Sequence, residues 1–255
     1  MKISKSKMLD FINCYNLNNL FESVKWDYNN LNKKLSVTFK SPDKSSLGIV
    51  LLKDIDLDTN DFSIGVYDTT KLKDLLNVFK DDEINIDFLM QNNSYTKINL
   101  YDDKDIFNVK YNLADLTIIP AGGAIKQKPN YDLVTECDFS TDFLNAHKAI
   151  KSQNFMINST KSTIKFIMFE DSDPTSNFKG NQIDITCKLL DTDENNNLLK
   201  DLYFDTSIFK SILLANNFKN AKCTLSISND GILKLEFSSD DFNNVYYLLV
   251  KSLGN

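Results

Sequence analysis

The sequence contains an internal duplication, and this feature restricts the possible fold more than any other. The segment VYDTTKLKDLLN, from Val66, resembles YFDTSIFKSILL, from Tyr203, 137 positions later. The segment ISKSKMLDF, from Ile3, resembles FSTDFLNAH, from Phe139, 136 positions later. Both offsets are close to half of the 255-residue length. A chain that repeats itself at this distance is expected to fold as two similar domains.

Each half combines short strands with two helices. Helical spacing of apolar residues predicts four helices, in residues 4–14, 69–80, 140–151 and 205–217. In the second of these, Leu72, Leu76 and Phe79 lie on one apolar stripe behind a capping residue such as Asp68. Alternation with period two predicts strands, among them residues 35–39, 84–88, 97–101 and 223–228. The fold class is therefore expected to be α+β.

A connector between the halves is expected in residues 115–131. The surrounding stretch, residues 113–132, contains two of the four prolines and the one Gly-Gly pair of the chain. Such residues are typical of an exposed loop. The boundaries are therefore expected to be an N-terminal domain in residues 1–114, the connector in residues 115–131 and a C-terminal domain in residues 132–255.

The charge pattern limits how this chain can bind nucleic acid. The net charge is −6, and all 29 basic residues are lysines. Without arginine, bidentate guanidinium contacts to guanine edges are excluded. An acidic chain can attract phosphates only where lysines gather on one face. The hydrophobic fraction of 42% is sufficient for a core. We expect a cytoplasmic location, because neither a signal peptide nor an apolar run near ~20 residues is found.

No motif for catalysis or for a cofactor is found. The four cysteines form no CxxC pair, and the chain has a single histidine, His147, so a zinc site is not expected. The segment from Asp191 begins like a calcium loop, but Asn196 and Leu202 replace the required glycine and glutamate. The stretch AGGAIK lacks phosphate-loop spacing. We therefore expect a protein that is not an enzyme and has no cofactor or metal.

Several segments resemble the PCNA-type and tailed-phage DNA sliding clamps. They are the tail LSISNDGILKLEFSSDDFNNVYYLLVK with its Tyr246-Tyr247-Leu248 tripeptide, the pair Trp26-Asp27 after the first helix, and IGVYDTTKLKDLL from Ile64. The resemblance implies the DNA clamp fold, with two similar domains that each contain two βαβββ units. It also implies that three chains close into a ring, with the helices lining the hole and the sheets outside.

The resemblance implies a polymerase processivity factor that encircles duplex DNA without sequence specificity. The expected partners are double-stranded DNA, a replicative DNA polymerase, a clamp loader ATPase and two further copies of the chain. If the protein comes from a bacteriophage, it acts in the host cytoplasm. Two alternatives stay open: a monomeric clamp-like polymerase accessory protein, and an enzyme or small-molecule binder on a duplicated α+β fold.

The resemblance and the helical patterns together give two sets of candidate site residues. The DNA-facing set is Lys5, Lys7, Lys73, Lys80, Asn145, Lys148, Lys151 and Lys210. The set for a pocket that binds partner peptides is Leu47, Ile49, Ile118, Ile119, Ile125, Ile232, Tyr247, Leu249 and Val250. Many PCNA-type chains have Ala-Pro where this chain has Leu249-Val250, so its partner motif is expected to differ. The edges that join the ring are expected in residues 105–113 and 183–189.

Loop residues usually lie on the surface, so the connector isoleucines are expected to form an exposed apolar patch. Asp10 and Asp74 lie on or near the lysine-bearing helix faces, so the DNA-facing surface is expected to be only weakly basic.

Overall fold

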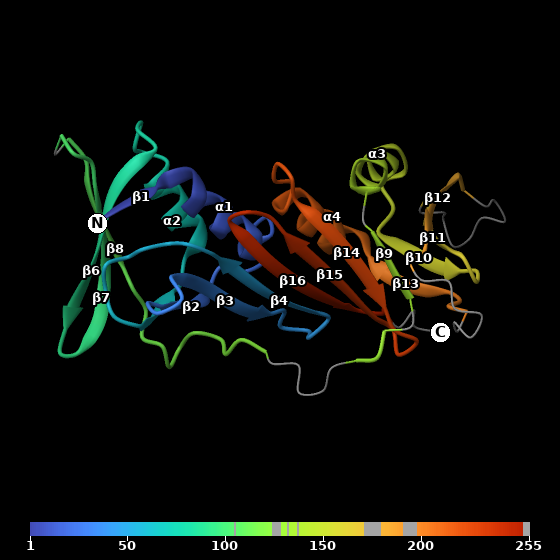
Figure 1. Ribbon diagram of the computed structural model, residues 1–255, viewed down its shortest axis with the longest axis horizontal. Helices are drawn as coiled ribbons and strands as arrows, with labels where there is room; N and C mark the ends of the chain where they lie inside the picture. The colour runs from blue at the N-terminus through green and yellow to red at the C-terminus, as the bar shows by residue number, and fades with distance from the viewer. Residues whose placement is uncertain are drawn as a thin grey trace. The chain divides into compact units, whose positions relative to one another are not determined.

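The computed structural model describes residues 1–104, 106–123, 129–131, 133–136, 138–170, 180–190 and 198–251. The chain divides into two compact units (Figure 1). The first unit comprises residues 1–42, 47–124 and 240–244, and the second comprises residues 43–46, 125–239 and 245–255.

The first unit contains two antiparallel sheets and two helices. Its elements are β1 (Lys2–Ser4), α1 (Lys5–Asn16), β2 (Val24–Asn29), β3 (Lys34–Lys40), β4 (Ser46–Leu52), β5 (Phe62–Val66), α2 (Thr69–Leu76), β6 (Glu83–Gln91), β7 (Ser94–Tyr101) and β8 (Asn108–Asn112). One sheet has the strand order β1-β6-β7-β8, and the other contains β5-β2-β3-β4. The strand before each helix thus pairs with strands that follow the other helix.

The second unit repeats this arrangement. Its elements are β9 (Leu133–Glu136), α3 (Ser140–Ile150), β10 (Asn154–Ser159), β11 (Thr163–Phe169), β12 (Gln182–Lys188), β13 (Leu202–Asp205), α4 (Thr206–Ala215), β14 (Lys222–Ile227), β15 (Ile232–Ser238) and β16 (Phe242–Leu249), whose C-terminal part belongs to this unit. One sheet has the order β12-β11-β10-β13, and the other contains β9-β14-β15-β16. The predicted α+β class with two βαβββ units in each half is confirmed.

The duplication is also visible at the helix starts. Asp68 caps α2, and Asp205 caps α4 by accepting hydrogen bonds from the backbone of residues 207 and 208. The next residue in each case, Thr69 or Thr206, donates its backbone N–H to the carbonyl of Glu22 or Gln153. The offset between these starts is 137 residues, as the sequence indicates. The other pair, α1 and α3, is offset by 135 residues, one fewer than the sequence alignment suggests.

Helix α2 is shorter than the predicted range of residues 69–80. It ends at Leu76, and Asn77 is its C-terminal cap. Phe79 is nevertheless buried, because the chain turns after the helix and the Phe79 ring packs edge-on against Phe107, with the centroids 6.0 Å apart. The apolar spacing therefore identified a buried residue correctly but not the end of the helix.

The core of the first unit is built around Trp26 of β2. Its ring packs edge-on against Phe11 of α1, with centroids 5.5 Å apart, and its Nε1–H donates a 3.3 Å hydrogen bond to the hydroxyl of Tyr15. All three side chains are fully or almost fully buried. Burial raises the pKa of Tyr15, so this hydroxyl stays neutral and fixes α1 to the sheet.

The core of the second unit is a cluster of phenylalanines. Phe209 of α4 lies 4.6 Å from Phe143 of α3 and 4.9 Å from Phe155 of β10, measured between ring centroids. All three are fully buried. The cluster joins both helices of the unit to the sheet below them.

Glu22 links the segment after α1 to the start of α2. Its carboxylate accepts hydrogen bonds from the Thr70 N–H at 2.8 Å, the Thr70 hydroxyl at 2.6 Å and the Asn16 side-chain amide at 3.3 Å. Burial opposes ionisation of Glu22, but these hydrogen bonds and the charge of Lys73 outweigh it, so its pKa lies below the usual value.

Replacing Phe209 with alanine should remove the ring that joins α3, α4 and β10. We expect the free energy of unfolding to fall by about 3–5 kcal/mol. Leu31, which is 89% exposed, provides the control: Leu31→Ala should change stability by no more than about 0.5 kcal/mol. Urea titration followed by circular dichroism measures both. Equal effects would show that the phenylalanine cluster is not the core of this unit.

Replacing Glu22 with glutamine should lower the free energy of unfolding by about 0.5–1 kcal/mol at pH 7. Because the folded-state pKa of Glu22 is lowered, the ionised group stabilises the fold at neutral pH and loses this effect as the pH falls through that pKa. The difference between the two proteins should therefore shrink as the pH falls through the folded-state pKa of Glu22. Exposed Glu136 gives the matched control, Glu136→Gln. A deficit of the same size at pH 7 and pH 3 would contradict the role given to Glu22.

Candidate functional site

The helices carry more positive charge than the rest of the chain. In each unit the two helices pack against each other, α1 against α2 and α3 against α4 (Figure 1). Together the four helices contain six lysines and three aspartates, a net charge of +3, whereas the whole chain carries −6. Phosphate groups would therefore be attracted to the helices rather than to the sheets.

Two of the candidate DNA-facing lysines already have partners in the first unit. The ammonium group of Lys5 donates a 2.8 Å hydrogen bond to the carbonyl of Phe79, and Lys7 forms a 2.6 Å ion pair with Asp241. Lys73 is half-buried, whereas Lys80 is exposed and forms no ion pair with any described residue. Lys80 therefore has more freedom to reach a phosphate than Lys5 or Lys7.

In the second unit the exposed candidates are Lys148 of α3 and Lys151, the residue that caps α3 with a left-handed backbone. Neither forms an ion pair within the described part of the chain. Lys210 of α4 is half-buried. Burial lowers the pKa of His147, and the nearby charge of Lys210 lowers it further. The histidine is half-buried, and its lowered pKa leaves it neutral at pH 7.

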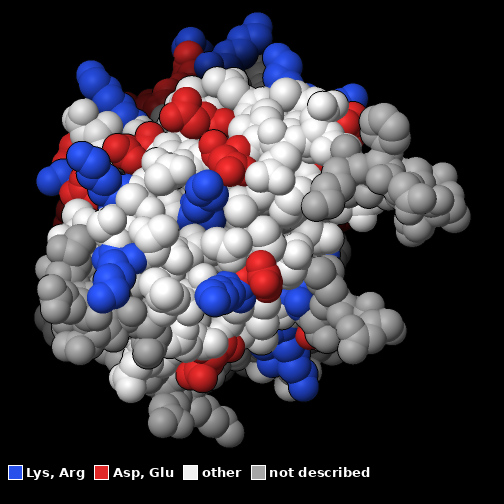
Figure 2. All heavy atoms as spheres, turned by 90° about the vertical axis from the view of Figure 1, so that its right-hand side faces the viewer, with Lys and Arg blue, Asp and Glu red and all other residues white. Residues whose placement is uncertain are grey.

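Asn145 has different surroundings from the lysines. It lines an open hollow beside β12, together with Ala146, Ile183 and Ile185. Figure 2 shows the right-hand side of the view in Figure 1. Lysines and acidic residues crowd together along its upper and upper-left margin and are scattered singly over the rest of the described surface, which is largely uncharged.

Aspartates reduce the positive charge of α1. Asp10 is partly buried, and this burial, together with the nearby carboxylates of Asp241 and Asp82, raises its pKa. Asp82 itself accepts a 2.8 Å hydrogen bond from the Ser6 N–H in the first turn of the helix. The helix surface of the first unit is thus only weakly basic, in agreement with the sequence.

Strand β8 forms a free sheet edge in the first unit. It pairs only with β7 in the strand order. The Leu113 N–H donates to Thr96 at 2.8 Å, and the Asp102 N–H donates to Phe107 at 3.3 Å. Because antiparallel pairing alternates, residues 109 and 111 bond to β7, while residues 108, 110 and 112 turn their N–H and C=O groups to the free side.

Strand β12 forms the corresponding edge in the second unit. It pairs only with β11, and the bonds from Glu170 to Asn181 (2.9 Å) and from Leu189 to Ser162 (3.1 Å) set the alternation. Residues 182, 184 and 186 therefore present their backbone groups to the free side. The predicted edges, residues 105–113 and 183–189, correspond to β8 and β12, which both lie at the end of a sheet. Asp105 lies outside the described residues, and the joining of copies through these edges stays a prediction. Sequence reasoning missed the division into paired and free positions, which depends on register.

The first part of the connector packs closely on the first unit. A side chain at Gly122 would collide with the backbone of Thr38, and one at Gly123 would meet the Leu47 side chain at 2.6 Å. Ile118 is 72% exposed, but Ile119 is only 8% exposed because it packs over Gly65. The expected exposure of the connector isoleucines is thus confirmed for Ile118 and wrong for Ile119. Ile125 lies outside the described residues.

The remaining candidates for a peptide pocket differ in exposure. Leu47 is half-buried and Ile49 is 37% exposed in the first unit. In the second unit, Ile232 and Tyr247 are half-buried, Leu249 is 43% exposed and Val250 is 36% exposed. Val250 lies against Gly231, whose φ of +77° suits a tight turn without a side chain. Ile118 and Leu249 are therefore the most accessible apolar side chains of this set that the structure describes.

No group of three or more His, Cys, Asp and Glu side chains among the described residues is placed to hold a metal ion. No helix in the described part of the chain is long and apolar enough to span a membrane.

The sequence matches no protein-family model and no curated protein sequence. Solved structures do match. The chain is similar to the proliferating cellular nuclear antigen of Entamoeba histolytica, with 14% identity, a TM-score of 0.70 and coverage of 98% of both chains. It is also similar to A. fulgidus PCNA bound to the C-terminal region of FEN-1, with 14% identity, a TM-score of 0.72 and coverage of 100% of this chain and 98% of that one. The chain therefore has the fold of the PCNA-type clamps over its whole length.

Proposed function

We propose that this protein is a DNA sliding clamp, a non-enzymatic processivity factor that encircles duplex DNA and tethers a replicative polymerase. The observation that carries the proposal is the complete PCNA-type fold, in which the helices of an acidic chain carry a net positive charge. A clamp loader ATPase would open and close the ring. If the source is a bacteriophage, these steps take place in the host cytoplasm.

Ring closure is proposed to occur by pairing of β8 of one copy with β12 of the next. An unpaired edge exposes backbone donors and acceptors and must be covered. The edges of β8 and β12 differ from each other, so their pairing is head-to-tail, and three copies close the ring if the rotation is suitable. The apolar side chains near the edges support this pairing: Ile106 is 67% exposed, and Val109, Ile183 and Ile185 are half-buried.

DNA binding is proposed to be weak and independent of sequence. Three chains would carry a charge of −18, three times the −6 of one chain, so attraction must come from the helices alone. Lysine contacts to phosphates supply an attraction that salt weakens and that carries no sequence information. A weakly basic lining suits a ring that slides.

The first test is directed at the ring. Lys110→Pro removes an N–H that faces the free side of β8, and Lys110→Ala removes the same side chain but keeps that N–H. We expect Lys110→Pro to be monomeric at micromolar concentration and Lys110→Ala to remain trimeric. Size-exclusion chromatography with light scattering measures both. A proline at 109 is unsuitable, because the N–H of Val109 faces β7 within the subunit.

A trimer that survives Lys110→Pro would show that β8 does not form the subunit contact. A wild-type chain that is monomeric at micromolar concentration, with and without DNA, would support the monomeric accessory protein instead.

The second test reverses charge on the helices. Lys73→Glu combined with Lys148→Glu should lower processive synthesis by about tenfold or more, because phosphate attraction becomes repulsion. The trimer should persist. Exposed lysines outside the helices provide the matched control, Lys34→Glu with Lys222→Glu, which alters net charge equally and should leave processivity near wild type. Equal losses in both double variants would mean that the helices are not the DNA-facing surface.

The third test concerns the partner peptide. Ile118→Asp and Leu249→Asp, made separately, change the two most accessible apolar candidates. Each anchor that is fully buried on binding contributes ~1.5–3 kcal/mol, so affinity for the C-terminal peptide of the cognate polymerase should fall by at least about tenfold. Leu31→Asp, at an 89% exposed position, is the control. Unchanged affinity in both variants, with the trimer intact, would place the site elsewhere.

A further inference from the structure

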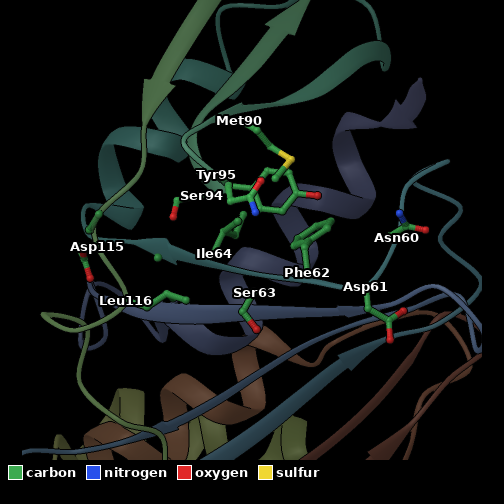
Figure 3. A pocket seen from close by; sticks show the side chains of 13 residues that line it. Asn60, Asp61, Phe62, Ser63, Ile64, Met90, Ser94, Tyr95, Asp115 and Leu116 are labelled. Atoms are coloured by element: carbon green, nitrogen blue, oxygen red, sulfur yellow. The ribbon is translucent and has the colours of Figure 1, made fainter.

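A hollow of about 580 Å³ lies beside β5 in the first unit (Figure 3). Three segments contribute to it: β5 with the residues before it, the tip of the β6–β7 hairpin, and the stretch that follows β8. The side chains used below are Asp61, Phe62, Ser63, Met90, Tyr95, Asp115 and Leu116. None of the surfaces proposed above for DNA, for ring closure or for the polymerase peptide includes these residues.

The floor of the hollow is a strand edge at which pairing stops. The Ala114 N–H donates a 2.9 Å hydrogen bond to the Gly65 carbonyl, an isolated antiparallel bridge on the side of β5 away from β2. The chain then turns away, because the Ile118 N–H bonds to the Asp115 carbonyl at 3.2 Å. By alternation, the N–H and C=O groups of Ser63 point to the same side as the Gly65 carbonyl, and none of the described strands continues the pairing there.

The walls of the hollow combine polar side chains, Asn60, Asn93 and Ser94, with an apolar stretch. Met90 is 55% exposed and Leu116 is 42% exposed, although both are large hydrophobic residues. Between them, Tyr95 lies over Phe62, with ring centroids 5.4 Å apart (Figure 3). One side chain of an added strand would find an apolar slot here, directly above the free backbone groups of Ser63.

The ends of the hollow are acidic. Asp115 and Asp61 lie at opposite ends (Figure 3), and no lysine is present among the described residues that line it. The Thr117 N–H and hydroxyl donate to Asp115 at 2.8 and 2.7 Å and lower its pKa, so it is ionised at neutral pH. A ligand that complements this surface has an apolar centre and basic ends.

We propose that the hollow binds an extended, lysine- or arginine-bearing peptide of a partner protein by adding it as a strand to the free edge of β5. Main-chain hydrogen bonds to Ser63 would continue the pairing that Ala114 begins with Gly65. The slot between Met90, Tyr95 and Leu116 would take an apolar side chain, and the two aspartates would bind the flanking cations. This proposal does not depend on ring formation or on DNA binding.

The probe is a random heptapeptide library displayed on phage. The library is first depleted on the full-length Leu116→Lys variant, which fills and charges the hollow but keeps every other surface, and is then selected on the wild-type chain. We expect the enriched peptides to alternate apolar residues and to carry lysine or arginine near both ends. If no sequence is enriched over the depleted library, or if the enriched peptides are acidic, the proposal is overturned.

The best peptide is then synthesised with a single N-methyl group at successive positions. Strand addition predicts alternation: methylation of the amide that faces β5 should weaken binding by more than about tenfold, and methylation of its neighbours should have little effect. Calorimetry on the unaltered protein measures this, so misfolding of a variant cannot confuse the result. If none of the methyl groups lowers the affinity, the peptide binds through its side chains alone, which contradicts strand addition.

Charge recognition is tested with Asp61→Asn combined with Asp115→Asn. Asparagine retains the Oδ1 acceptors used by Asn30 and Thr117 and removes the charges. It also gives up the long 3.5 Å hydrogen bond from the Asn29 side chain to Asp61 Oδ2. Affinity should fall by roughly fivefold at low salt, and much less at high salt. The matched control is Asp74→Asn with Asp230→Asn, two exposed positions outside the hollow. The same loss in the control would mean that overall charge, and not this site, attracts the peptide.

Discussion

The pairing of β1 with β6 and of β5 with β2 is the interaction on which the rest of the first unit depends. Strand β1 precedes α1 and pairs with β6, which follows α2, so that Ile3 lies opposite Ile84. Strand β5 precedes α2 and pairs with β2, which follows α1, so that Trp26 lies opposite Ile64. Both helices are thereby held side by side over one core. The same exchange through β9 and β13 organises the second unit, and β8 and β12 each lie at the end of a sheet, with one edge open.

The molecule presents two different kinds of surface, the helices and the open sheet edges. The helices carry the net positive charge, while the remainder of the chain is acidic. The open edges carry backbone donors and acceptors flanked by half-buried aliphatic side chains such as Val109 and Ile185. Charge of one sign on the helices favours phosphates, whereas the edges favour another strand. A sliding clamp needs both surfaces, kept apart from each other.

The sequence predicted the elements well because local patterns determine them. Apolar spacing located all four helices, and aspartate caps marked the starts of α2 and α4. The repeat at 137 residues related the strand and helix start at Val66 to those at Tyr203. Long-range contacts were not predictable. Ile119 is buried because Gly65, 54 positions earlier, has no side chain. Lys7 pairs with Asp241, which is 234 positions away. The hollow beside β5 depends on where a turn diverts the chain after Ala114, which no periodicity reveals.

Topological encirclement is the central claim, and retention on circular DNA tests it most directly. The protein would be loaded by its cognate loader onto a singly nicked circular plasmid and passed through a gel-filtration column at high salt, where phosphate contacts are screened. Retention on the circle, followed by release when a restriction enzyme linearises the same plasmid, is the predicted result. Release from the circle at high salt, or equal retention on circular and linear DNA, would contradict a ring that encloses the duplex.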